Sequence, residues 1–158
     1  MMDSGWSLSE HRVDAGTARC GIIWQHERIR ALLDTARSIA EPTADGATPS
    51  PKALATAIAE IRSAVEAHFA YEEKYWLPVL SGDIPLGRER ASEILLEHAG
   101  QRDLTARLYY ESCTGPDSPG LASGLMFLAA WLLSHMADEE RCLVSPRNRD
   151  RDFFVIAQ

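Results

Sequence analysis

Two segments of this chain repeat one amphipathic pattern, and in both a histidine and a glutamate fall on the face that should be apolar. The first segment contains Leu54, Ile58, Ile61, Val65, His68, Glu72 and Tyr75. The second contains Leu121, Leu125, Leu128, Leu132, His135, Glu139 and Cys142, each 67 positions after its counterpart. Spacings of four and three residues put every member of a set on one side of an α-helix. The chain must therefore fold into helices whose buried faces include ionisable groups.

Segments rich in Pro, Gly, Ser and Asp divide the chain, and we expect them to be loops: 41–51, 78–87 and 113–120. Between them are four segments of helical composition without β-branched alternation: about 18–40, 51–77, 86–112 and 119–143. Four helices of this length joined by short loops predict an all-α fold, an up-down-up-down antiparallel four-helix bundle. We expect an N-terminal arm at 1–17, the bundle at 18–146, and a C-terminal tail at 147–158 that folds back or contacts a protein partner or a second copy.

The composition argues against several classes of protein. With 158 residues, 46% of them hydrophobic, the chain is expected to be one soluble domain. A net charge of −7 and only two lysines argue against nucleic-acid binding and against a polybasic membrane segment. The apolar stretch 121–136 is short for a membrane span, and the N-terminus does not look like a secretory signal. Three cysteines without a CxxC motif indicate a reducing cytoplasm and no thiolate metal site.

The other two expected helices each place one more histidine on an apolar stripe. His26 lies among Ile22 and Ile29, and His98 follows Ile94. Because neighbouring helices of the bundle run in opposite directions, all four helical histidines are expected roughly 12–18 Å from the same end, at about 1.5 Å per residue. The predicted layer comprises His26, His68, Glu72, His98, His135 and Glu139.

A metal ion explains this layer better than a network of polar side chains alone. Buried, unpaired carboxylates cost several kcal/mol each, and no Lys or Arg shares the stripe of Glu72 or Glu139. The six donors exceed the four that structural zinc takes, and imidazole with carboxylate indicates iron or manganese. If both glutamates bridge, two ions fit, with an oxo or hydroxo bridge and about two open positions. Glu73 and Glu140 point elsewhere on the helix, and we expect them to face solvent or a neighbouring helix.

The motifs "QHERIRALL", "HFAYEEKYWLP" and His135-x-x-x-Glu139 resemble the hemerythrin-like family, also called the HHE cation-binding domain, over residues 19–146. The resemblance implies a non-haem di-iron centre, with Mn or Zn as substitutes, and reversible binding or sensing of O₂ or NO, or redox chemistry. The chain departs from the invertebrate oxygen carriers, because Arg102 replaces a fifth histidine and Glu139 replaces an aspartate. The departure adds an open position and favours a sensor or redox role over oxygen storage.

Several residues near the expected layer are candidates for contact with a bound cofactor or ligand. Gln101 is three residues after His98, Tyr75 three after Glu72, and Trp131 one turn before His135. Trp131 is expected to pack in the core and to wall a ligand pocket, and core packing is also expected of Trp24. Tyr75 is expected to be a buried, hydrogen-bonded tyrosine, and the alternative is that it bonds to the site or transfers electrons. His11 is either a surface residue or a fifth nitrogen ligand from the arm.

Three functions fit these observations. The first is a di-iron protein that binds or senses O₂, NO or a related oxidant. The second is a redox enzyme on the same centre, active against peroxide or nitrosative stress, although no substrate or flavin motif supports it. The third is a regulatory bundle whose metal is vestigial. The sequence leaves the enzyme question open.

Overall fold

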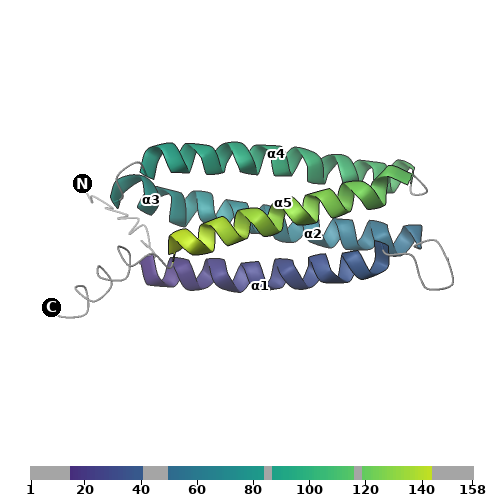
Figure 1. Ribbon diagram of the computed structural model, residues 1–158, viewed down its shortest axis with the longest axis horizontal. Coiled ribbons are helices and arrows are strands. Elements are labelled where there is room, and N and C mark those ends of the chain that lie inside the picture. Colours follow the sequence, from purple (N-terminus) through teal and green to yellow (C-terminus); the bar gives the residue numbers. More distant parts are fainter. Residues whose placement is uncertain (1–14, 41–49, 84–86, 116–118, 144–158) are drawn as a thin grey trace, which may run out of the picture.

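The computed structural model describes residues 15–40, 50–83, 87–115 and 119–143 of the chain. Four long helices make up most of it: α1 (Ala15–Ala40), α2 (Pro51–Tyr71), α4 (Gly87–Thr114) and α5 (Pro119–Leu143). They run alternately in opposite directions along one axis (Figure 1), and each packs against two neighbours in the cyclic order α1, α2, α4, α5. The described residues contain no strand. The predicted all-α four-helix bundle is confirmed.

Helix α2 begins where the sequence has a capping residue followed by proline. The Ser50 hydroxyl accepts a hydrogen bond from the Ala53 amide at 3.4 Å, and Pro51 occupies the first helical position of α2. Ser is a preferred N-cap, and Pro costs nothing at a position whose amide has no intrahelical partner. Helix α1 begins at Ala15, so the last residues of the expected arm are helical.

The prediction that 78–87 forms a loop is wrong over its first half. After Tyr71 the chain makes a π-helical turn, η1 (Glu72–Trp76), and continues as α3 (Leu77–Asp83). Pro78 lies inside this continuous helical segment, directly after the π-helical turn. A proline there lacks an amide donor and crowds the preceding turn, so an irregular turn at this point agrees with its position. Trp76 and Leu80 are buried against α4, and this burial favours a further helical turn over an exposed loop.

The interior is divided into two apolar clusters. The larger fills the half of the bundle towards the α1–α2 and α4–α5 connections and includes Ile58, Leu108 and Leu125. The smaller, around Trp76 and Leu143, closes the other end beneath α3. The histidines and glutamates of the predicted layer lie between these clusters along every helix that contributes them. The bundle therefore encloses a polar layer between two apolar regions.

Helix α5 is the most apolar element. Its segment Gly120–Leu143 has the length and composition of a membrane span, with a mean hydropathy of 1.5. The prediction that this region is too short to span a membrane considered residues 121–136 alone, whereas the helix is longer. Within the bundle, Leu121, Leu125 and Leu128 are fully buried, so core packing accounts for one face of the helix, whereas Phe127 is 63% exposed.

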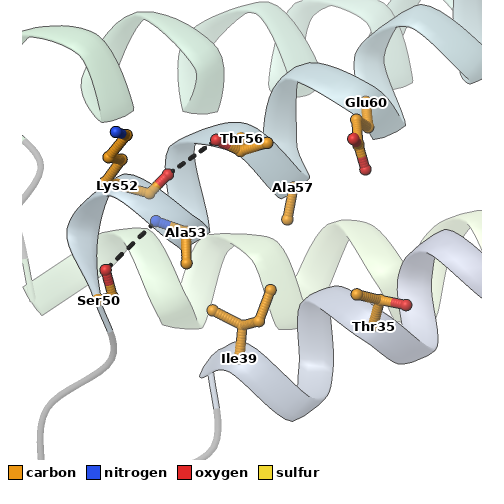
Figure 2. A pocket seen from close by; sticks show the side chains of 8 residues that line it. All are labelled: Thr35, Ile39, Ser50, Lys52, Ala53, Thr56, Ala57 and Glu60. Atoms are coloured by element: carbon orange, nitrogen blue, oxygen red, sulfur yellow. Dashed lines mark hydrogen bonds between the residues drawn. The ribbon is translucent and has the colours of Figure 1, made fainter.

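A pocket opens at the bundle end remote from α3, between the end of α1 and the start of α2. Figure 2 shows Thr35 and Ile39 of α1 facing the first turns of α2. Its lining is formed by Thr35, Ile39, Ser50, Lys52, Ala53, Thr56, Ala57 and Glu60. With one carboxylate and no imidazole in this set, the pocket does not resemble a metal site.

Candidate metal centre

The six predicted ligand residues converge in one buried layer. They come from all four long helices and from η1, and none has more than 2% of its surface exposed: His26, His68, Glu72, His98, His135 and Glu139. Each lies on the inward face of its helix because apolar residues one turn away on the same face are buried in the core. The structure therefore brings together the whole predicted set.

All four imidazoles turn their Nε2 atoms towards the two carboxylates. Glu72 Oε2 lies 3.2 Å from the Nε2 of His98 and 3.5 Å from that of His68. Glu139 Oε2 lies 3.3 Å from the Nε2 of His26, and its Oε1 lies 3.2 Å from that of His135. All of these nitrogen and carboxylate oxygen atoms are buried, and none has a hydrogen-bond partner. Lone pairs that converge without hydrogen bonds fit a cation.

The donors divide into two overlapping groups. His26 and His68 form one group with both glutamates, and His98 and His135 form the other with the same glutamates. In each group the four ligand atoms lie within 4.8 Å of one another. Either group could hold a metal ion, and the shared carboxylates connect the two positions.

Glu73 and Glu140 have a role that the sequence did not reveal. Of the two predicted surroundings, solvent or a neighbouring helix, both residues have the second, although the prediction did not identify their partners. Glu140 Oε1 lies 2.8 Å from His26 Nδ1, and Glu73 Oε1 lies 3.0 Å from His98 Nδ1. A carboxylate at Nδ1 orients an imidazole so that Nε2 can bind metal. The signal available was the Glu-Glu doublet, which recurs with the 67-residue repeat.

Arginines hold these outer carboxylates in place. Arg30 donates to Glu140 Oε1 at 2.7 Å, and Arg102 donates to Glu73 Oε1 at 2.7 Å. Arg102 also donates to Glu66 at 3.1 Å. The residue that stands in place of a fifth histidine is therefore part of an ion-pair network, and its guanidinium cannot ligate a cation.

The four imidazoles do not have equivalent support. Glu97 Oε2 lies 2.8 Å from the Nδ1 of His135, which is the third such carboxylate pair. The Nδ1 of His68 is buried and has no hydrogen-bond partner. His98 is also held by its neighbour Phe69, whose ring stacks on the imidazole at a centroid distance of 3.9 Å.

The remaining predicted residues lie in different surroundings. Gln101 is fully buried. Trp131 is partly buried at the α4–α5 contact, where its ring approaches Gly100. Trp24 is 63% exposed, so its predicted core packing is wrong. His11 lies outside the described residues.

Tyr75 is not on the buried face with Glu72, contrary to the prediction. It is half-buried, and its ring lies 4.9 Å from that of Tyr71. A π-helical turn contains more than 3.6 residues, so Trp76 follows Glu72 on the inward side. The repeat then continues as Trp76 and Leu143, both buried and 67 residues apart. Cys142 is likewise only partly buried.

Burial determines the protonation of the inner groups when no metal is bound. Desolvation, followed by repulsion from Glu139, raises the pKa of Glu72 well above its ordinary value. Desolvation and the neighbouring imidazoles lower the pKa of His68 to about 2. Burial alone would raise the pKa of Glu73, but hydrogen bonds from Arg102 and His98 lower it overall. The His68 imidazole is therefore neutral at neutral pH, and the outer Glu73 carboxylate stays ionised.

Comparison with known proteins agrees with this geometry. Searches of curated proteins and of solved structures each gave no match. The family model described as the hemerythrin HHE cation binding domain matches residues 23–145, which include all six inner residues. The domain suggests cation binding, typically of iron. On this match, together with the all-α bundle, the chain belongs to the hemerythrin HHE cation-binding domain family.

Proposed function

We propose that this protein is a non-haem di-iron protein that binds or senses O₂, NO or a related small oxidant. The observation that supports it most directly is the pair of overlapping donor groups that share Glu72 and Glu139. Two ions in these positions would each have two imidazoles and the shared carboxylates. Such a donor set leaves coordination positions for an external molecule on ions that prefer six ligands.

Iron held there would supply a redox-active ion able to bind a diatomic molecule. The protein residues would orient the imidazoles and limit which molecules reach the site. His26 and His98 would be held in one tautomer by Glu140 and Glu73. The apolar clusters on both sides would exclude bulk water and bulky substrates. Because every inner residue has at most 2% of its surface exposed, the site suits a small molecule rather than a large one.

The deciding experiment is metal analysis with optical spectroscopy on protein purified anaerobically and then exposed to O₂ or NO. Two irons per chain and a charge-transfer band that appears on exposure would support the proposal. A band that decays within seconds would favour sensing over storage. One iron or fewer after anaerobic reconstitution of folded protein would refute it. Peroxide turnover well above that of free iron would instead indicate a redox enzyme.

A further inference from the structure

The bundle has an internal two-fold relationship that makes its two halves comparable. Residues of α1 correspond to residues of α4 that lie 72 positions later, as His26 does to His98 and Arg30 to Arg102. Residues of α2 and η1 correspond to residues of α5 that lie 67 positions later. The hydrogen bonds follow this relationship, because Glu140 joins His26 to Arg30 just as Glu73 joins His98 to Arg102.

The two halves differ one turn beyond the histidine. On α1 the next inward residues are Ile29 and Leu33, each 1% exposed. Their counterparts on α4 are Gln101, 0% exposed, and Thr105, 2% exposed. The half of the site that contains His98 and His135 is therefore bordered by polar side chains where the other half is apolar.

Gln101 is the unusual member of this pair. Thr105 donates its hydroxyl proton to the backbone carbonyl of Gln101 at 2.6 Å, so its donor is used. Neither Oε1 nor Nε2 of Gln101 has a hydrogen-bond partner, although both atoms are buried. A buried amide without a partner costs free energy, and an isoleucine at the matched position shows that an apolar residue fits. This free-energy cost suggests that the Gln101 amide gains its hydrogen-bond partner when a ligand binds.

Gln101 lies about one helical turn from His98, and both are on the buried face of α4. Three residues advance about 4.5 Å along an α-helix, and residues three apart share a face. The guanidinium of Arg102, which follows Gln101 on α4, donates to Glu73 and Glu66. Among the described side chains of α4, Gln101 is thus the amide donor whose buried N–H groups have no hydrogen-bond partner; the Nε1 of Trp76 in η1 is another buried donor without one.

We propose that the Nε2 of Gln101 donates a hydrogen bond to a small external ligand held at the His98–His135 position, and so directs the ligand to that half of the centre. The proposal rests on the di-iron function proposed above. The ligand class is a small anion or diatomic molecule with an acceptor atom. Gln101 is here a residue that determines ligand affinity and does not supply a bond to the metal.

The test uses the iron-loaded full chain and azide as the probe. Gln101→Ile installs the residue of the matched position, and Ile29→Leu is the control in the other half. We expect azide affinity to fall at least tenfold in Gln101→Ile and to change less than twofold in Ile29→Leu. The azide stretching band should shift between H₂O and D₂O in the wild type and not in Gln101→Ile.

Iron content separates this inference from the proposed function. Two irons in every variant with unchanged azide affinity would overturn the role of Gln101 and leave the di-iron proposal standing. Loss of an iron in Gln101→Ile alone would make Gln101 a metal ligand, which also overturns it. Failure of the wild type to hold two irons would refute the function itself. If Gln101→Ile does not fold, Gln101→Leu, which avoids β-branching, takes its place with the same criteria.

Discussion

The Nδ1 of His26 lies 2.8 Å from the Oε1 of Glu140, although 114 residues separate them in the chain. The same contact joins His98 to Glu73 at 3.0 Å. Glu73 and Glu140 each follow a glutamate of the candidate metal layer, Glu72 or Glu139. Each Glu-Glu doublet therefore places one carboxylate in the layer and one at the Nδ1 of a histidine on another helix. This arrangement makes the outer carboxylates testable parts of the centre.

Replacing Glu140 by Ala should weaken metal binding without removing a ligand. Loss of the carboxylate that orients His26 is expected to lower metal affinity by about 10–100-fold, the usual effect of losing such a partner. Competition with a chelator of known affinity measures this. Glu140→Gln, which keeps an acceptor oxygen, should lose less. Glu111→Gln is the matched control, because its ion pair with Arg107 is long, at 3.9 Å, and remote from the site. Equal affinity in Glu140→Ala and wild type would contradict the role assigned to Glu140.

Metal removal should destabilise the wild type more than His68→Ala, because His98 and His135 still form a donor group with Glu72 and Glu139 in the variant. A ligand that binds only the folded state stabilises it by RT ln(1 + [M]/Kd), which is about 2.7 kcal/mol when the free metal is at a hundredfold excess over Kd. Calorimetry with and without chelator gives this difference for each protein. The comparison within one protein cancels the packing lost with the side chain. A chelator-sensitive shift of the same size in both proteins would show that His68 is not a ligand.

Glu72→Gln should make the metal-free protein more stable at neutral pH while abolishing its metal site. Because the pKa of Glu72 is raised on folding, the folded state binds more protons than the unfolded state above pH 4.5. Stability is therefore lost as the pH rises from 4.5 towards the folded-state pKa, by about 1.4 kcal/mol per pH unit from this group. Gln cannot ionise, so the free energy of unfolding of the variant, measured with denaturant, should increase relative to that of the wild type as the pH rises. A pH-independent difference between the two would contradict the assignment.

Two glycines should respond oppositely to alanine. At Gly82 of α3 a new Cβ would meet nothing within 4 Å, so Gly82→Ala should stabilise the protein by about 0.5–1 kcal/mol through helix propensity. At Gly100 the Cβ would lie 2.6 Å from the Trp131 ring, so the ring or the helix that carries it would have to shift. We expect Gly100→Ala to destabilise by about 1–3 kcal/mol. Urea unfolding of both variants checks this, and a stabilised Gly100→Ala would show that Trp131 moves aside easily.

Much of this protein could be predicted from helical periodicity alone. The 67-residue repeat placed Glu72 and Glu139 on the same face as His68 and His135, and the structure confirms that all four are buried. Periodicity works here because residues spaced by three and four share a helix face whatever the helix packs against. Because α1 and α4 run opposite to α2 and α5, the histidines near the starts of α1 and α4 lie in the same layer as those near the ends of α2 and α5.

Other features depended on the packed bundle. Glu73 and Glu140 lie off the apolar face, and only the neighbouring helix decides whether such a residue meets water or an imidazole. The π-helical turn that moved Tyr75 outward and Trp76 inward could not be read from a regular period of three and four residues. Pro78 follows it closely, and the buried Trp76 packs in the cluster that includes Ile94 of α4. The sequence by itself determined which side chains could form the metal layer. Tertiary structure decided which carboxylates orient it, because those contacts join residues of different helices.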